Sequence, residues 1–239
     1  MKKILIFVFV LIIIFLIYLS TMDKKVYYLA VGDSLATSEG SNGFRVKGYT
    51  DYLKDYLDSK NVLEKYVNDF AKSGYRIYDL INDIENNKKV KNGKEYITLK
   101  NSLVKADLVT ISIGANDLLD KFNSEYLSEA DIYNYIDEMS NDLDKLLKLI
   151  RQYCKEDIVM VGYYNPFKNL NLDKYISYLN DKYSDVALEY DISYVRIDDI
   201  FKSHPEYLPS DDNIHPTQEG YKAISKEVIS MSEKKLFET

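Results

Sequence analysis

A serine, a histidine and an aspartate are placed where they could act together as a nucleophile and its base. Ser34 follows Gly32-Asp33 at the end of an apolar run that begins at Tyr27. His215 has Asp212 three residues before it, and this spacing lets the carboxylate reach the imidazole across a turn. A serine nucleophile needs a base, which is usually a histidine near neutral pH. We therefore predict that Ser34, His215 and Asp212 form a catalytic triad.

The choice of base has few alternatives, because the chain contains two histidines. His204 has Phe201 at the offset where His215 has Asp212, so it lacks a carboxylate partner at this spacing. Asp211 is the alternative partner of His215, one residue out of step with the expected spacing. A loop histidine without a catalytic role is the structural alternative for His215.

Acyl transfer also needs hydrogen-bond donors aimed at the oxyanion that develops on the carbonyl. The backbone N–H of Ser34 is one candidate, and Gly74 can present a second N–H at close range because it has no side chain. Asn116 can add a side-chain amide. Taken alone, Gly74 is typical of a helix entry and Asn116 of a turn. Their occurrence in one chain with Ser34 favours an oxyanion hole of Ser34, Gly74 and Asn116.

Strands and helices alternate along the chain. Five short runs rich in β-formers predict strands: 27–31, 66–71, 108–113, 158–163 and 192–197. Apolar residues at helical spacing predict helices: 49–57, 76–84, 128–153, 172–188 and 217–235. Ser128 and Asp131 resemble a capping pair at the start of the longest helix. We expect loops over 36–48 and 86–94. Five alternations predict an α/β doubly wound parallel sheet.

The polar residues that follow these strands define a candidate site. Ser34, Gly74, Asn116 and Asn165 each come at or just after the end of a predicted strand. The carboxyl ends of parallel strands share one edge of the sheet, and ligands bind there in open α/β folds. The sequence shows no internal repeat and no second domain, so we predict one catalytic domain over residues 26–239.

Residues 1–25 form a separate segment. Sixteen apolar residues run without a break from Ile4 to Leu19, after Lys2 and Lys3. Extended through residue 22, the stretch spans roughly 28 Å as a helix, close to the hydrocarbon thickness of a bilayer. We predict an uncleaved, single-pass transmembrane helix in the cell membrane, with the domain extracellular. A cleaved signal peptide and a secreted domain are the alternative, although the stretch lacks a small-x-small cleavage site.

Charge and composition argue against several other kinds of function and site. Residues 26–239 carry 27 basic and 37 acidic side chains, a net charge of −10, which argues against unspecific binding of nucleic acid. Cys154 is the single cysteine, so no internal disulfide can form, and this count leaves the compartment open. Two histidines offer no convincing ligand cluster, so we expect neither a metal nor a cofactor.

Four motifs in order resemble the blocks of the SGNH/GDSL hydrolases, a family of esterases and lipases. They are Gly32-Asp33-Ser34-Leu35, Gly74, Gly114-x-Asn116-Asp117 and Asp212-x-x-His215-Pro216. Each block is weak alone, but the set covers most of residues 26–230. The resemblance implies a flavodoxin-like, three-layer α/β/α fold with a five-stranded parallel sheet. The anchor and Asn165-Pro166 are most similar to a membrane-associated, lipase/acylhydrolase-like subgroup from Gram-positive bacteria. Ala36 departs from the threonine common after the first block.

The resemblance implies a serine esterase or lipase that cleaves carboxylic esters through an acyl-enzyme. Its substrate would be a small ester, a lipid or an acylated glycan. Two other functions use features of the same chain. An O-acetyl esterase or acetyltransferase acting on envelope polysaccharide would use the same triad. A tethered, non-catalytic binding protein would keep the fold, although the intact set of site residues argues against it. A nucleotide-binding domain is disfavoured by a first loop without a glycine-rich phosphate pattern.

Overall fold

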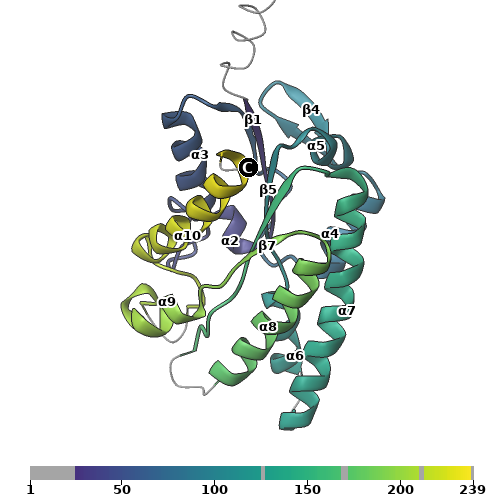
Figure 1. The fold of residues 1–239 in the computed structure, drawn as a ribbon. Coiled ribbons are helices and arrows are strands. Elements are labelled where there is room, and N and C mark those ends of the chain that lie inside the picture. Colours follow the sequence, from purple (N-terminus) through teal and green to yellow (C-terminus); the bar gives the residue numbers. More distant parts are fainter. Residues whose placement is uncertain (1–24, 125–126, 168–171, 210–212, 238–239) are drawn as a thin grey trace, which may run out of the picture.

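A five-stranded parallel sheet forms the centre of the molecule. The computed structural model describes residues 25–124, 127–167, 172–209 and 213–237 (Figure 1). The strands are β1 (Val26–Gly32), β2 (Leu63–Val67), β5 (Leu108–Ser112), β6 (Asp157–Val161) and β7 (Ser193–Val195). They lie in the order β2-β1-β5-β6-β7, and every neighbouring pair is parallel. The predicted three-layer fold with a five-stranded parallel sheet is confirmed.

The order of the strands places the site. Counted along the chain within this sheet, the order is second, first, third, fourth, fifth, so its direction reverses between β1 and β5. Ligands of doubly wound sheets bind at this switch point, beyond the carboxyl ends of the two strands. Every residue of β1 and β5 is buried, and Gly32 lies opposite Ser112 at their ends. Burial on both faces explains why β1 is a continuous apolar run up to Gly32 and why β5 is largely apolar, with Thr110 and Ser112 as its polar residues.

Helices cover both faces of the sheet (Figure 1). One face is covered by α3 (Tyr49–Ser59) and α10 (Gln218–Phe237), which pack against each other. The other is covered by α4 (Ile77–Glu85), α5 (Leu99–Lys105), α7 (Glu129–Tyr153) and α8 (Asp173–Glu189). The predicted capping pair of α7 is confirmed, because Ser128 Oγ accepts from the N–H of Asp131 at 3.3 Å and the Asp131 carboxylate accepts from the N–H of Ser128 at 3.0 Å.

Several short elements differ from the sequence prediction. The second strand is Leu63–Val67, so the predicted range 66–71 is too late in the chain. The expected loop 86–94 contains β3 (Lys89–Asn92), which pairs antiparallel with β4 (Glu95–Thr98). The short elements α2 (Ser34–Thr37), α6 (Ala115–Ser124), α9 (Asp198–Ser203) and the 3₁₀ helix η1 (Pro205–Tyr207) were not predicted. Two of them, α2 and α6, carry site residues.

The predicted membrane anchor is not part of the described structure. Residues 1–24 lie outside it, so the transmembrane helix expected there stays a prediction. Within residues 25–124, 127–167, 172–209 and 213–237, no helix combines the length and the apolar character needed to cross a bilayer.

Candidate active site

Ser34 lies at a sharp turn between strand β1 and the short helix α2. Gly32 closes the strand with φ +127°, and a Cβ there would lie 1.9 Å from the carbonyl oxygen of Ser112 on β5. Only glycine can combine this backbone conformation with so close an approach. Asp33 then caps α2 by accepting from the N–H of Leu35 at 3.1 Å. The N–H of Ser34 therefore belongs to the first helical turn, whose amides have no acceptor within the helix.

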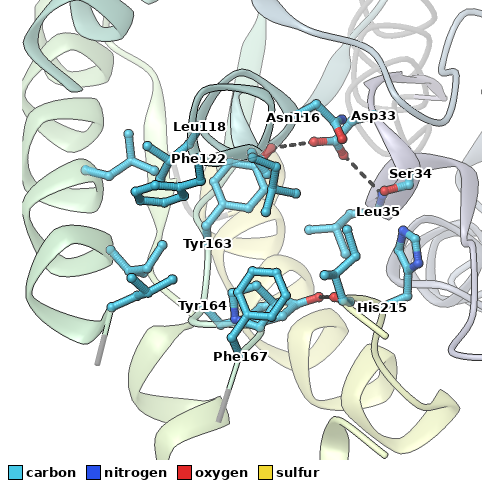
Figure 2. A pocket seen from close by; sticks show the side chains of 17 residues that line it. Asp33, Ser34, Leu35, Asn116, Leu118, Phe122, Tyr163, Tyr164, Phe167 and His215 are labelled. Carbon is cyan, nitrogen blue, oxygen red and sulfur yellow. Dashed lines mark hydrogen bonds between the residues drawn. The ribbon is translucent and has the colours of Figure 1, made fainter. Parts of the chain in front are cut away.

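Asp33 is buried beneath this turn and bonded on several sides. Its Oδ2 accepts from the Tyr163 hydroxyl at 2.6 Å (Figure 2). Its Oδ1 accepts from the Ser112 hydroxyl at 2.9 Å. The residue is 1% exposed. Burial disfavours the charged form and raises the pKa of Asp33 to about 6, although the hydrogen bonds from Tyr163, Ser112 and Leu35 oppose the shift. The carboxyl group thus joins β1, β5 and the chain after β6.

Asn116 connects the first turn of α6 to the loop that carries Gly74. Its Nδ2 donates to the carbonyl oxygen of Tyr75 at 2.9 Å. A side-chain amide has two donor hydrogens, so one remains for an oxyanion. Gly74 adopts φ +79° in this loop, which is tied to β1 by a bond from the N–H of Lys72 to the carbonyl oxygen of Gly32 at 2.9 Å. Asn116 lines the cleft beside Ser34, whereas Gly74 is not among the cleft-lining residues.

Asp117, from the same sequence block, fixes the other end of this loop. Its Oδ2 accepts from the N–H of Ile77, the first residue of α4, at 3.2 Å. Burial raises the pKa of Asp117 to about 7, against the opposing bond from Ile77. The Asn116-Asp117 pair therefore holds residues 75–77 against α6, which sets the position of Gly74 relative to Ser34.

His215 faces the same cleft from the loop before α10. The backbone N–H of His215 donates to Asn213 Oδ1 at 2.9 Å. The Tyr164 hydroxyl donates to the carbonyl oxygen of Ile214 at 2.6 Å. The imidazole points toward Ser34 in Figure 2. Its Nε2 is buried and has no hydrogen-bond partner within the described residues. Burial lowers the pKa of His215, and the nearby carboxylate of Glu39 acts in the opposite direction.

The remaining predicted site residues have different positions. Asp212, the predicted third member of the triad, and its alternative Asp211 lie outside the described residues. His204 is exposed, with its Nδ1 2.9 Å from Glu206 Oε1 and its ring stacked on Tyr207. Asn165 does not line the cleft; its side chain accepts from the N–H of Phe167 and donates to Asp173.

A largely apolar cleft extends from Ser34 between α6 and α8. Its polar lining residues are Asp33, Ser34, Asn116 and His215, joined by the hydroxyls of Tyr163 and Tyr164. Aliphatic and aromatic side chains form the rest (Figure 2): Leu35, Leu118, Leu119, Phe122, Phe167, Leu172, Ile176, Leu179 and Ile214 among them. This wall is not predicted from the sequence, although Tyr163 lies at the end of the predicted strand 158–163 and Tyr164 follows it.

Comparison with known proteins identifies the family to which these features belong. Residues 30–223 match the model of the GDSL-like lipase/acylhydrolase family. The chain belongs to this family. As a GDSL-like hydrolase it is a carboxylic ester hydrolase, and the matched region includes Ser34, Gly74, Asn116 and His215. The predicted family is therefore confirmed.

Relatives of this GDSL-like hydrolase include lipases and esterases. The spore germination lipase LipC of Bacillus licheniformis is 26% identical over 210 residues, which cover 84% of this chain and 93% of LipC. The crystal structure of the lipase Lip_vut3 from a goat rumen metagenome has a TM-score of 0.70 and 25% identity, covering 87% of this chain and 98% of that one. The acetylxylan esterase Axe2 of Geobacillus stearothermophilus shares the fold, with a TM-score of 0.63, 20% identity and coverage of 90% and 96%.

Within the described part of this hydrolase, no group of three His, Cys, Asp or Glu side chains could hold a metal ion. Cys154, 0% exposed at the end of α7, has its thiol pKa raised by burial and lies outside the cleft.

The buried Asp33 makes stability depend on pH in a defined direction. Its pKa rises from 3.8 in an ordinary aspartate to about 6 in the fold, so the folded state binds the proton more tightly. Its contribution to the free energy of unfolding therefore falls as the pH rises through this interval. We expect Asp33→Asn to gain stability relative to wild type over the same interval, by up to about 3 kcal/mol above pH 6.

Denaturant unfolding at unit steps from pH 4 to pH 8 measures this difference. Asp58→Asn, an exposed change on α3, is the matched control and should show no such trend. A stability difference between Asp33→Asn and wild type that stays constant across these pH values would contradict the prediction.

Proposed function

We propose that this hydrolase cleaves esters through a covalent acyl-enzyme formed on Ser34. The observation that carries the proposal is the shared cleft, in which Ser34 lies beside a half-buried His215 whose buried Nε2 has no hydrogen-bond partner in the described structure. An unpaired buried acceptor is costly, and a substrate-ready serine hydroxyl is the group that would satisfy it. Apo geometries of this kind tighten when substrate binds.

In the proposed reaction, His215 Nε2 takes the proton of the Ser34 hydroxyl as Oγ attacks the ester carbonyl. The oxyanion that forms receives hydrogen bonds from the N–H groups of Ser34 and Gly74 and from the second amide hydrogen of Asn116. The imidazolium then gives its proton to the leaving alkoxide, which departs as the alcohol. Water, deprotonated by His215, then attacks the acyl carbonyl. The bond to Ser34 Oγ breaks, the imidazolium returns its proton to Oγ, and the acid leaves. Asp212 is proposed to orient the imidazole.

The apolar wall of the cleft favours an acyl chain longer than acetyl. Leu118, Leu119 and Phe122 from α6 face Ile176 and Leu179 from α8 across this space. Burying each methylene of an acyl chain contributes about 0.8 kcal/mol. An O-acetyl esterase acting on polysaccharide remains the second candidate. It is supported by the shared fold with an acetylxylan esterase, but it leaves this apolar surface without a ligand.

A series of chromogenic acyl esters from acetyl to dodecanoyl, given to the full chain, tests the acyl preference. We expect kcat/KM to rise with chain length beyond acetyl. In Leu119→Trp, the indole would occupy the cleft, so octanoyl ester hydrolysis should fall by about tenfold or more while acetyl ester hydrolysis is retained.

Leu188→Trp is the matched control for this variant, because Leu188 lies on α8 with 77% of its surface exposed. Turnover restricted to acetyl esters would favour the polysaccharide esterase. Turnover of no ester by a folded protein would favour the tethered binding protein.

The proposed place of action is the outer side of the cell membrane, with residues 1–25 as the anchor. The support is the sequence itself, since sixteen consecutive apolar residues follow Lys2 and Lys3. Cell fractionation distinguishes this arrangement, which leaves the domain in the membrane fraction, from a cleaved signal peptide, which releases it into the medium.

A further inference from the structure

Glu39 lies directly behind the nucleophile turn and is fixed there by its backbone. Its N–H donates to the carbonyl oxygen of Ser34 at 3.0 Å. Its own carbonyl oxygen accepts from the Tyr221 hydroxyl of α10 at 2.6 Å. The backbone of Glu39 is therefore bonded both to the residue proposed as nucleophile and to the helix that follows the loop of His215.

The carboxylate of Glu39 contacts two further parts of the site. Oε1 lies 3.9 Å from His215 Nδ1, within ion-pair distance. Oε2 accepts a hydrogen bond from the hydroxyl of Ser73, the residue before Gly74. The side chain of Glu39 is 24% exposed and that of His215 13%, so water screens this pair less than an exposed one. One carboxylate thus contacts the proposed base and the loop of the proposed oxyanion hole.

We propose that Glu39 is a positioning residue for His215, which it orients through Nδ1 so that Nε2 faces Ser34. A carboxylate beside Nδ1 favours the tautomer that carries its proton there, and this leaves the Nε2 lone pair free to accept the serine proton. The same carboxylate stabilises the imidazolium that forms during acyl transfer. This inference rests on the proposed function, because it gives Glu39 a role only if His215 is the base.

The distance between Glu39 and His215 determines how the carboxylate acts on the imidazole. At 3.9 Å the contact is too long for a direct hydrogen bond and becomes an ion pair when the imidazole is protonated. Ser73 keeps the carboxylate from rotating away. Asp212 lies outside the described residues.

The charged and titratable groups around His215 influence the pKa of its imidazole. Ser34 faces it from the start of α2 in Figure 2. The carboxylate of Glu39, two residues beyond the end of this helix, lies near His215 Nδ1. Tyr164 bonds the neighbouring residue Ile214, and Asp33 is the other acidic group that lines the cleft. Asp211 and Asp212 precede the histidine in the chain. Burial has the largest effect on the pKa of His215 and lowers it, whereas the charge of Glu39 raises it.

Proton NMR of the full chain tests the proposal without depending on catalysis. The chain has two histidines, so His204→Ala assigns the two imidazole signals. We expect Glu39→Gln to lower the pKa of His215, because removing the negative charge destabilises the imidazolium. The acid limb of the pH profile of kcat/KM should move to lower pH for the same reason, and kcat should fall about tenfold, or ~1.4 kcal/mol.

Glu219→Gln is the matched control, since it removes an exposed carboxylate on the first turn of α10 and should move neither quantity. Glu39→Asp keeps the charge and should recover part of the pKa shift and of the rate. An unchanged His215 pKa in Glu39→Gln would overturn the proposal, even if the rate falls, because a purely structural role would lower activity without shifting the titration. Absence of Ser34-dependent ester turnover in wild type would instead refute the proposed function.

Discussion

Ser34→Ala should lower kcat for ester hydrolysis by about 10³-fold or more, because members of a catalytic triad act as a unit. The variant keeps the cleft and the amide donors around the oxyanion, but it has no Oγ to form the acyl-enzyme. Since the hydroxyl contributes little to holding the substrate, KM should change far less than kcat. Steady-state kinetics with the acyl ester that wild type hydrolyses fastest measures both constants.

Covalent labelling is an independent test that Ser34 is the nucleophile. An aryl phosphonate that reacts with activated serines should modify the peptide that contains Ser34 in wild type and leave Ser34→Ala unlabelled. Ser41→Ala is the control, because it removes a hydroxyl from the loop after α2 without touching the cleft. Near-normal turnover by a correctly folded Ser34→Ala, or labelling at another serine, would contradict the assignment of the nucleophile.

The central strands were predictable because their burial leaves a strong pattern in the sequence. β1 and β5 are covered on both faces, so each is a largely apolar run that ends in a glycine or polar turn, with Thr110 and Ser112 as the polar residues of β5. β2 lies at the edge of the sheet, and only Val67 of its five residues is buried. An edge strand with mixed exposure has a weak pattern, which explains why the second strand was placed too late in the chain.

The short helices at the site depend on contacts that a local pattern does not encode. α2 has four residues and begins where Asp33 caps it, so its formation depends on the turn at Gly32 and on packing against β1. α6 starts at Ala115, directly after Gly114, where the sequence reads as a turn. Isolated helices of this length are unstable in water, and tertiary packing supplies most of their stability.

In the candidate site, too, residues marked by a local sequence pattern were predictable, whereas residues brought together only by the fold were not. Ser34 and Asn116 were predictable because they directly follow buried strands at the switch point. Glu39 was not, since it lies in what reads as a polar loop and meets His215 only through the fold. The apolar wall was missed for a similar reason, because it combines residues of α6 and α8 that are separated by more than fifty positions.

Gly32→Ala should destabilise the fold by about 3 kcal/mol or more, the largest loss that we expect from a single methyl group in this protein. The added Cβ would lie 1.9 Å from the Ser112 carbonyl oxygen and 2.8 Å from its carbonyl carbon, and both are backbone atoms that cannot rotate away. Relief would require β1 and β5 to separate where Gly32 pairs with Ser112. This separation would also displace Asp33 and Ser34, so activity should fall with stability.

Gly74→Ala isolates the steric contribution from the backbone strain. Gly74 also has a positive φ, +79°, but no atom lies within 4 Å of the Cβ that alanine would add. Its substitution should therefore cost only the strain of the left-handed conformation, about 1 kcal/mol. Urea unfolding followed by circular dichroism compares the two variants, a suitable probe because the chain has no tryptophan. Equal losses in both would show that the close approach of β1 and β5 does not require glycine at position 32.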